Sequence, residues 1–333
     1  MSEPAPLLQV RGLVKHFPMR GGFIDRLRGH PAQVIRAVDG VDLTIREGET
    51  LALVGESGCG KSTTGRCVLF LQDPTAGTVT FRGRPIDPTN AGEMRERRKQ
   101  LQIVFQDPNS SLNPRMTVGQ TLEEALAFHK IVPKSDRSAR VRELLETVGL
   151  NEQFRGRYAN ELSGGQRQRI GIARALAVDP ELIVADEAVS ALDVSVQAQI
   201  LQLLARLREE KGLAYLFISH QLGVVRSISD AVAVMYLGKI VEQAPTEQIF
   251  RNPLHPYTQA LMAAAPIPNP RARRERIILT GDPPSPVNPP SGCRFRTRCR
   301  YVTEHCAAEV PELREIEPSH LVACHYAGEL PAL

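Results

Sequence analysis

A glycine-rich stretch that ends in lysine and serine carries the clearest chemistry in this sequence. It follows an apolar run over residues 51–54, precedes a segment compatible with a helix, and fits the phosphate-binding pattern G-x-x-x-x-G-K-[ST]. In such a loop successive N–H groups face one concavity, and the next helix adds the positive end of its dipole. Lys61 would reach the β- and γ-phosphates of a nucleotide, and the Ser62 hydroxyl would ligate Mg²⁺. The expected nucleotide-binding residues are Gly55, Glu56, Ser57, Gly58, Cys59, Gly60, Lys61, Ser62 and Thr63.

Two carboxylates follow another apolar run, over residues 182–185. A buried strand that stops at an acidic residue places that residue at the crevice where α/β sheets bind ligands. Asp186 would hold Mg²⁺ through water, and Glu187 could orient an attacking water molecule as a general base. Capping of the next element is the alternative, but it does not explain why both follow a fully apolar strand in a chain with a phosphate loop.

Two more apolar runs end in polar side chains suited to such a site. Residues 101–105 lead to Gln106, and residues 215–218 lead through a serine to His220. A lone histidine is usually structural, but His220 shares its strand-end position with Gln106 and Asp186. We therefore take all of these strand ends as candidates for one site.

A second helix start that could bind an anion lies directly before a helix-like run over residues 167–177. Its N–H groups and serine hydroxyl would face outward. It consists of Ser163, Gly164, Gly165 and Gln166. Taken alone, these residues indicate a plain N-cap. Phe17 poses a similar choice, because its ring could stack on a nucleotide base or simply fill the core at a strand end.

The elements that must position these residues can be traced along the chain. Short strands joined by turns are expected over residues 8–54, with a polar connection at about 19–33. Apolar residues spaced three and four apart predict helices over residues 117–149. Past residue 250 proline becomes frequent, and residues 283–290 cannot form a helix or a central strand.

Composition narrows the function classes. The chain has 333 residues, with 41 Lys and Arg against 37 Asp and Glu, and a formal net charge of +4. This excess of positive charge is too small to favour nucleic-acid binding. The aromatic content of 5%, without Trp, is also too low to favour the stacking of bases. No apolar run approaches the roughly 18 residues of a membrane span, and the N-terminus has no signal-peptide pattern. We expect a cytoplasmic protein that associates with a membrane only through partners.

Six motifs together resemble those of the nucleotide-binding subunit of ATP-binding cassette (ABC) transporters. They are the phosphate loop, the Q-loop glutamine, the signature at residues 162–166, the acidic strand end, the D-loop at residues 190–193 and the switch histidine. They occur in the family's order between about residues 8 and 250. The resemblance implies an α/β fold, a P-loop NTPase cassette at residues 1–250 with an antiparallel β subdomain and a helical subdomain at about 107–178.

The same resemblance implies an ATPase that uses ATP and Mg²⁺, and it makes Phe17 the aromatic that stacks on adenine. The implied catalytic residues are Glu187, His220 and Gln106. The implied magnesium ligands are Ser62, Gln106 and Asp186. The signature and D-loop residues implied to bind nucleotide are Ser163, Gly164, Gly165, Gln166 and Asp193. In the family the signature of one subunit covers the nucleotide of another, so two cassettes must close on two ATP molecules.

The C-terminal third resembles the tail of dipeptide/oligopeptide permease ATP-binding subunits, in residues 252–262, 266–268 and 286–295. This implies a peptide importer at the cytoplasmic face of the membrane. Its implied partners are a second, different ABC ATPase in a heterodimer, two integral membrane permeases and, indirectly, an extracytoplasmic substrate-binding protein. Relatives carry nickel, glutathione or cell-wall peptides, so the cargo is open to these alternatives.

A Pro-rich linker is expected at residues 251–290, followed by a small Cys-rich extension at residues 291–333. The extension carries Cys293, Cys299, Cys306 and Cys324. A cytoplasmic protein seldom keeps disulfides, so four clustered cysteines indicate metal first. Their irregular spacing lacks the C-x₂-C pairs of structural zinc sites and suits an iron–sulfur cluster at least as well. The subfamily resemblance implies a [4Fe–4S] cluster, with zinc and free thiols as alternatives.

Other phosphate-loop classes fit the sequence less well. A GTPase would carry Asn-Lys-x-Asp, which is absent, and a kinase has no use for the Ser-Gly-Gly signature. A soluble cassette ATPase of translation or DNA repair is the more serious alternative. Such proteins usually join two cassettes or insert a long coiled coil, and this sequence has neither.

Overall fold

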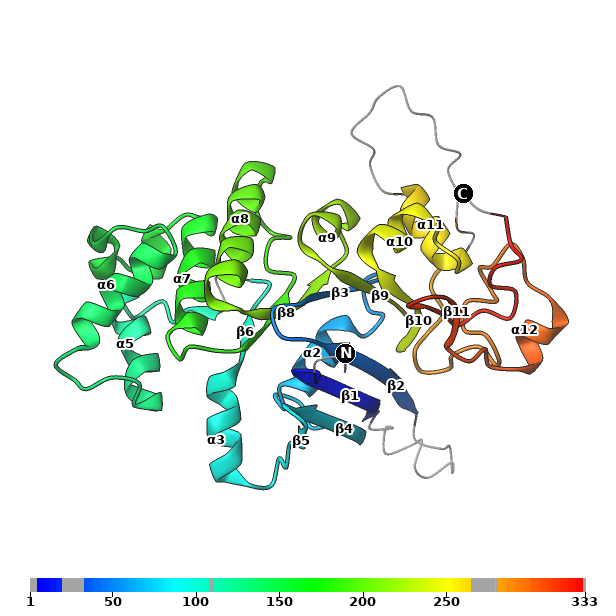
Figure 1. The fold of residues 1–333 in the computed structure, drawn as a ribbon, viewed down its shortest axis with the longest axis horizontal. Helices are drawn as coiled ribbons and strands as arrows, with labels where there is room; N and C mark the ends of the chain where they lie inside the picture. The colour runs from blue at the N-terminus through cyan, green and yellow to red at the C-terminus, as the bar shows by residue number, and fades with distance from the viewer. Residues whose placement is uncertain (1–4, 20–32, 108–110, 265–278, 280, 332–333) are drawn as a thin grey trace, which may run out of the picture. The chain divides into compact units, whose positions relative to one another are not determined.

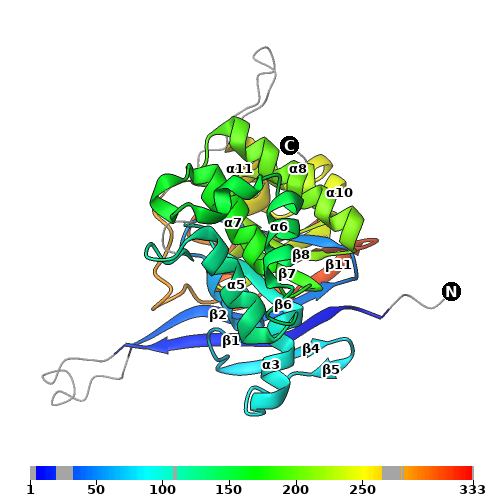
Figure 2. The same ribbon diagram turned by 90° about the vertical axis from the view of Figure 1, so that its left-hand side faces the viewer.

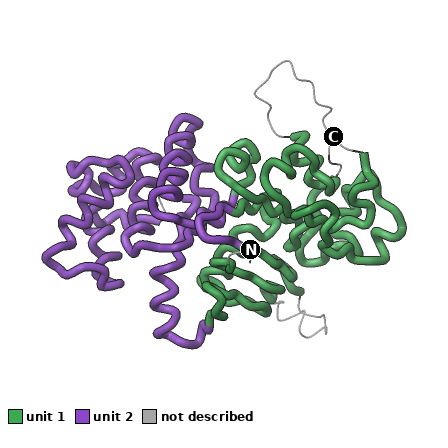
Figure 3. The backbone as a smooth tube through the Cα atoms, viewed as in Figure 1, with its two compact units in different colours: residues 1–44, 51–86, 219–333 green, residues 45–50, 87–218 purple. Residues whose placement is uncertain are grey.

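The structure is a computed structural model that describes residues 5–19, 33–107, 111–264, 279 and 281–331 (Figure 1 and Figure 2). The polar connection predicted at about 19–33 lies almost entirely outside these residues. Residues 265–278 and 280 of the predicted linker also lie outside them. The chain divides into two compact units, drawn in different colours in Figure 3. Unit 1 comprises residues 1–44, 51–86 and 219–333, and unit 2 comprises residues 45–50 and 87–218.

Unit 1 contains an antiparallel sheet in the order β2-β1-β4-β5. Its strands are β1 (Leu8–Pro18), β2 (Val34–Ile45), β4 (Ala76–Phe81) and β5 (Arg84–Pro85). Leu8 and Val10 on β1 are fully buried and lie opposite Phe81 and Val79 on β4. Gln9 between them is less buried, which is the alternation expected for a sheet with one face on the core.

A second set of strands in unit 1 follows the order β11-β12-β10-β9-β3. These are β3 (Thr50–Val54), β9 (Ala231–Tyr236), β10 (Lys239–Pro245), β11 (Arg314–Glu317) and β12 (His320–Val322). β3 and β9 are parallel and read as nearly continuous buried apolar runs, as parallel strands covered on both faces do. β10, β11 and β12 pair antiparallel, so the C-terminal extension continues this sheet.

In the described part of unit 1 the helices are short. They are α2 (Lys61–Val68), α9 (Leu222–Ile228), α10 (Thr246–Arg251), α11 (Pro256–Ala264) and α12 (Glu304–Ala308). α2 begins directly after the glycine-rich stretch, and α11 carries a largely buried face that includes Tyr257.

Unit 2 contains the parallel strands β6 (Leu101–Val104), β7 (Leu182–Asp186) and β8 (Ala214–Ser219), in the order β8-β7-β6. Val104 on β6 pairs with Ala185 on β7, so both strands end at the same edge. Every residue of β7 is buried, including Asp186 at its carboxyl end. Side chains that follow these strands are thereby brought to one edge of the sheet.

The rest of unit 2 is helical. Among the described residues of unit 2, the α-helices are α3 (Ala91–Gln100), α5 (Val118–His129), α6 (Arg137–Thr147), α7 (Gly164–Leu176) and α8 (Val194–Lys211). Its 3₁₀ helices are η1 (Glu152–Gly156) and η2 (Ala159–Glu161). Thr117 starts α5 with a capping box that includes Gln120, and apolar faces of α5, α6 and α7 pack together.

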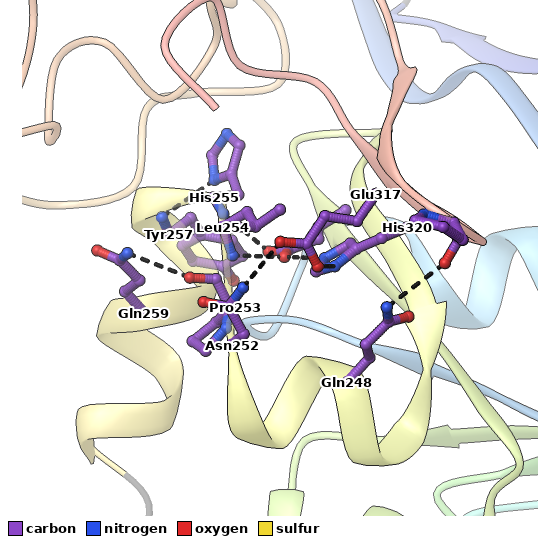
Figure 4. A network of polar contacts seen from close by, with 11 residues as sticks. Gln248, Asn252, Pro253, Leu254, His255, Tyr257, Gln259, Glu317 and His320 are labelled. Carbon is purple, nitrogen blue, oxygen red and sulfur yellow. Dashed lines mark hydrogen bonds and ion pairs between the residues drawn. The ribbon is translucent and has the colours of Figure 1, made fainter. Parts of the chain in front are cut away.

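The segment predicted as a linker from residue 251 differs from that expectation in its first part. α11 lies within it, and Tyr257 and Met262 of this helix belong to the core formed with β9 and β10. Buried Glu242 on β10 accepts hydrogen bonds from the N–H groups of Leu254 and His255, at 2.7 and 3.0 Å (Figure 4). This packed helix was missed by the sequence analysis, because proline content alone does not show which apolar side chains will be buried in the core.

None of the helices in the described ranges is both long enough and apolar enough to cross a membrane.

Candidate functional site

The phosphate loop joins β3 to α2, as the sequence predicts. Gly55, Gly58 and Gly60 have φ values of 155°, 80° and 110°, which favour glycine. A Cβ on Gly55 would lie 2.2 Å from the Met235 carbonyl oxygen, and one on Gly60 would lie 2.1 Å from that of Ala37. Neighbouring backbone therefore excludes side chains at both positions and sets the curvature of the loop.

Lys61 folds back over this loop. Its side chain is buried, and Nζ donates hydrogen bonds to the carbonyl oxygens of Gly55 and Glu56, at 2.8 and 2.9 Å. Cys59 Sγ lies 3.8 Å from the same Nζ, and burial raises the pKa of the Cys59 thiol. The ammonium group is thus held by carbonyl oxygens close to where its predicted phosphate partners would bind.

Phe17 and His220, which also belong to unit 1, are partly accessible. Phe17 lies near the end of β1, its ring is half-buried, and Lys15 Nζ lies 5.0 Å from the ring centroid. His220 directly follows β8 and is exposed. Both side chains can therefore contact a ligand, and their roles stay predictions.

In unit 2 the structure brings together two of the predicted catalytic side chains. Gln106 Nε2 donates a hydrogen bond of 3.0 Å to Glu187 Oε2, although the residues are 81 positions apart. Glu187 has a φ of 48°, a left-handed conformation that is uncommon outside glycine and is often found at functional sites. Its N–H donates to the carbonyl oxygen of Ile218 on β8. Asp186, beside it, is only 3% exposed.

The signature stretch of unit 2 starts α7 with a capping box. Ser163 Oγ accepts from the Gln166 N–H at 3.3 Å, and Gln166 Oε1 accepts from the Ser163 N–H at 2.9 Å. A Cβ on Gly165 would lie 2.4 Å from Val196 on α8, so this position needs glycine for close packing. The stretch is therefore an N-cap in this structure, and its role towards a nucleotide stays a prediction.

Asp193, the predicted D-loop residue, is the N-cap of α8. Its Oδ1 accepts hydrogen bonds from the Ser195 hydroxyl and the Val196 N–H, at 2.7 and 3.0 Å. These bonds lower the pKa of the Asp193 carboxyl group. The Val196 N–H thus donates to the Asp193 carboxylate, and the Val196 side chain packs against Gly165. Val196 therefore connects the D-loop with the signature within unit 2.

The four tail cysteines line one small cavity of about 10 Å³ in unit 1. Burial raises the pKa of Cys293 and of Cys324 to about 11, and it also raises that of Cys299. Within the described ranges, no group of three or more His, Cys, Asp or Glu side chains has an arrangement that could hold a metal ion. The four thiols of the predicted cluster therefore border one cavity, but among the described residues they do not form a metal-binding group, and the cluster stays a prediction.

Two residues that contact the phosphate loop were missed by the sequence analysis. Tyr257 Oη accepts a hydrogen bond of 2.8 Å from the Glu56 N–H, and Arg298 Nη1 donates one of 2.8 Å to Glu56 Oε2. They lie 201 and 242 residues further along the chain than Glu56. No pattern in the sequence signals contacts over such separations.

Comparison with known proteins agrees with this description. Residues 38–190 match the family described as ABC transporter, and residues 241–306 match the oligopeptide/dipeptide transporter C-terminal region. The ATP-binding cassette MJ0796, solved as a dimer in a post-hydrolysis state with ADP and Pi, is 31% identical. Its TM-score is 0.63, over 72% of this chain and 98% of that one. Fold and site thus define an ABC ATPase with the P-loop NTPase architecture.

Two relatives match nearly the whole chain. The oligopeptide transport ATP-binding protein AppF of Bacillus subtilis (strain 168) is 51% identical over 322 residues, covering 96% of this chain and 97% of that protein. A putative peptide import ATP-binding protein of Brucella ovis is 52% identical over 319 residues, with coverage of 96% and 97%. The chain belongs to the family of ATP-binding subunits of oligopeptide ABC transporters.

Proposed function

We propose that this chain is the ATP-hydrolysing subunit of a peptide importer. The observation that carries the proposal is the hydrogen bond between Gln106 and Glu187, because it places an amide and a carboxylate together at the carboxyl ends of two parallel strands. The phosphate loop would bind the phosphates of ATP, and the Gln106 and Glu187 pair would activate the attacking water molecule. The names of AppF and of the Brucella protein support peptides as the cargo.

Each candidate residue has a distinct part in the proposed reaction. Lys61, which is held by the Gly55 and Glu56 carbonyl oxygens, would neutralise charge on the β- and γ-phosphates of ATP. The Mg²⁺ that accompanies ATP would be held by Ser62, Gln106 and Asp186, and it would screen the same charge. Glu187 accepts a proton from the attacking water molecule. His220 would act as the catalytic switch histidine, and Phe17 would stack on the adenine ring.

The proposed reaction needs a second cassette. Ser163, Gly164 and Gly165 would cover the nucleotide on the partner, so closure of two subunits on two ATP molecules precedes hydrolysis. The dimeric state of the similar cassette MJ0796 supports this arrangement. We infer a second, different ABC ATPase as the partner, and two membrane permeases that are moved by closure. An extracytoplasmic peptide-binding protein would deliver the cargo, and the chain would lie peripherally at the cytoplasmic face of the membrane.

Co-purification tests the assignment to transport. An affinity-tagged full chain, extracted with mild detergent from its native cells, is expected to bring down two polytopic membrane proteins and a second ATPase, since the cassette acts by moving permeases. The interacting proteins are identified by mass spectrometry. Recovery of ribosomes or DNA in place of membrane proteins would contradict the proposal and favour a soluble cassette ATPase.

We also propose that the tail cysteines hold a thiolate-ligated metal group, with a [4Fe–4S] cluster first and zinc as the alternative. The support is the convergence of Cys293, Cys299, Cys306 and Cys324 on one cavity. Four thiolates are the usual donor set of such a cluster. The observed arrangement would have to open around the group, so no step of ATP hydrolysis is assigned to it.

Anaerobic purification of the full chain tests this second proposal. Brown protein with equal amounts of iron and acid-labile sulfide is expected, and Cys306→Ser should lose most of both because one ligand is removed. Cys67→Ser is the matched control, since Cys67 is a buried cysteine of α2, outside the tail. Colourless wild-type protein that contains zinc would show that the thiols bind zinc and not an iron–sulfur cluster. Protein free of both metals would show that the thiols are unliganded.

A further inference from the structure

The peptide unit between Gly55 and Glu56, at the start of the phosphate loop, is held at both polar ends. Its carbonyl oxygen, on Gly55, accepts from Lys61 Nζ at 2.8 Å, and its N–H, on Glu56, donates to Tyr257 Oη at 2.8 Å. A peptide unit is planar, so both groups turn together when the backbone rotates. Tyr257 therefore fixes the direction of a carbonyl group on which the phosphate-binding lysine rests.

The side chain of Glu56 is held as well. Arg298 Nη1 donates to Glu56 Oε2 at 2.8 Å, and the two side chains are 7% and 27% exposed. Burial alone would lower the pKa of Arg298, but the hydrogen bond to the Glu56 carboxylate and the charge of that carboxylate outweigh burial, and the pKa is raised. A charge-assisted bond in a mostly buried setting is stronger than a surface ion pair. Glu56 is thus fixed through both its backbone and its carboxylate.

Tyr257 is itself fixed by packing against the C-terminal part of the chain. The Tyr257 ring lies 4.7 Å from that of Tyr236 and 5.4 Å from that of Phe295, measured between centroids. All three rings are at most 2% exposed. Phe295 and Arg298 share the segment from Cys293 to Cys299. One short segment of the extension therefore supports both contacts to the loop.

The start of α11 holds the backbone of Tyr257 in place. His255 Nδ1 accepts a hydrogen bond of 3.0 Å from the Tyr257 N–H, and buried Glu242 accepts from the His255 N–H (Figure 4). Burial lowers the pKa of His255 to about 4, so the imidazole is neutral and Nδ1 can act as an acceptor. His320, also fully buried, approaches the same Glu242 carboxylate at 2.7 Å.

We propose that Tyr257 and Arg298 are positioning residues of the ATP site, which hold the phosphate loop in its binding conformation. The inference rests on the proposed ATPase function and deepens it. A preorganised loop loses less conformational freedom when it closes on a ligand. Loss of either contact should therefore weaken ATP binding. Proton transfer is assigned to Glu187, so the turnover of saturated enzyme should be retained.

The first test compares Tyr257→Phe with wild type in the assembled transporter. Removing the hydroxyl leaves the ring in its packing site and takes away the acceptor of the Glu56 N–H. The KM for ATP should rise about five- to tenfold, the effect of one lost hydrogen bond, while kcat stays within about twofold. Equilibrium binding of ATP without Mg²⁺, which prevents turnover, should show the same loss. Tyr215→Phe is the matched control, because this buried hydroxyl donates to the Leu204 carbonyl.

The second test uses the Glu56 and Arg298 pair, which does not depend on a buried tyrosine. Glu56→Gln and Arg298→Gln should each raise the KM for ATP, and the double variant should be no worse than the poorer single variant. Arg298→Lys should restore part of the affinity because it keeps the charge. Arg296→Gln is the control, since Arg296 bonds to Ser291 within the extension.

These measurements separate the inference from the function on which it rests. Wild-type KM values in Tyr257→Phe and Arg298→Gln, in protein with an unchanged melting temperature, would overturn the positioning role. An equal rise in KM in Tyr215→Phe or Arg296→Gln would also overturn it, because the effect would then be general. Failure of the proposed function would show differently, as ATP binding that is undisturbed by replacement of Lys61 itself.

Discussion

Replacing Glu187 by glutamine is expected to lower ATP hydrolysis by the assembled transporter at least about a hundredfold, the usual contribution of a general base, while ATP still binds. The glutamine side chain has nearly the same shape and keeps an oxygen that can accept the hydrogen bond from Gln106 Nε2. It cannot accept a proton from water. The loss should therefore appear in kcat, measured as phosphate release at saturating ATP.

A matched control exists at the opposite end of the same two strands. Glu181, directly before β7, accepts a hydrogen bond of 3.0 Å from Gln100 Nε2, directly before β6. Glu181→Gln makes the same chemical change to the same kind of pair at the wrong edge of the sheet. Hydrolysis by Glu181→Gln should stay near wild type. Undiminished turnover in Glu187→Gln, or an equal loss in both variants, would remove Glu187 from the proposed role.

Replacing Lys61 by methionine is expected to weaken ATP binding about ten- to a hundredfold, because a charged donor to the phosphates is lost. Methionine fills much of the buried space of the lysine side chain, so the fold should be retained. The variant also leaves the Gly55 and Glu56 carbonyl oxygens without the donor they have now. Titration with ATP, followed by calorimetry, gives the affinity.

Lys99→Met on α3 controls for the loss of a positive charge. Lys99 pairs with Glu96 on the surface of that helix, at 2.9 Å, and is not part of a predicted site. Its removal should leave the affinity for ATP unchanged. An affinity of Lys61→Met equal to that of wild type would contradict the assignment of the loop as the ATP site.

Short motifs made part of this site predictable from the sequence. The phosphate loop could be located because its glycines, lysine and serine are adjacent in the chain, and the structure shows why Gly55 and Gly60 admit no side chain. The contact between Gln106 and Glu187 follows from strand order, since the carboxyl ends of parallel strands share an edge. The proposed roles of these residues stay predictions until the variants are measured.

Other features could not be predicted, for physical reasons that particular residues make clear. Tyr257 lies in a proline-rich stretch that the sequence indicates as a linker, yet it is fully buried. Its burial depends on Tyr236 and Phe295, which lie on other segments of the chain. Local spacing gives no information about such packing. The cysteines are a different case. Their number predicts a metal group, the described residues do not form a metal-binding arrangement, and the group therefore stays a proposal.

The most direct test of the account is peptide uptake by proteoliposomes that contain the full transporter, with ATP hydrolysis measured in the same samples. Wild-type vesicles should accumulate a labelled peptide only when ATP is on the side of this chain, and Glu187→Gln should abolish uptake and hydrolysis together. Hydrolysis without peptide uptake in wild type would contradict the proposed cargo. Uptake that continues in Glu187→Gln would contradict the central claim that this chain drives transport by hydrolysing ATP.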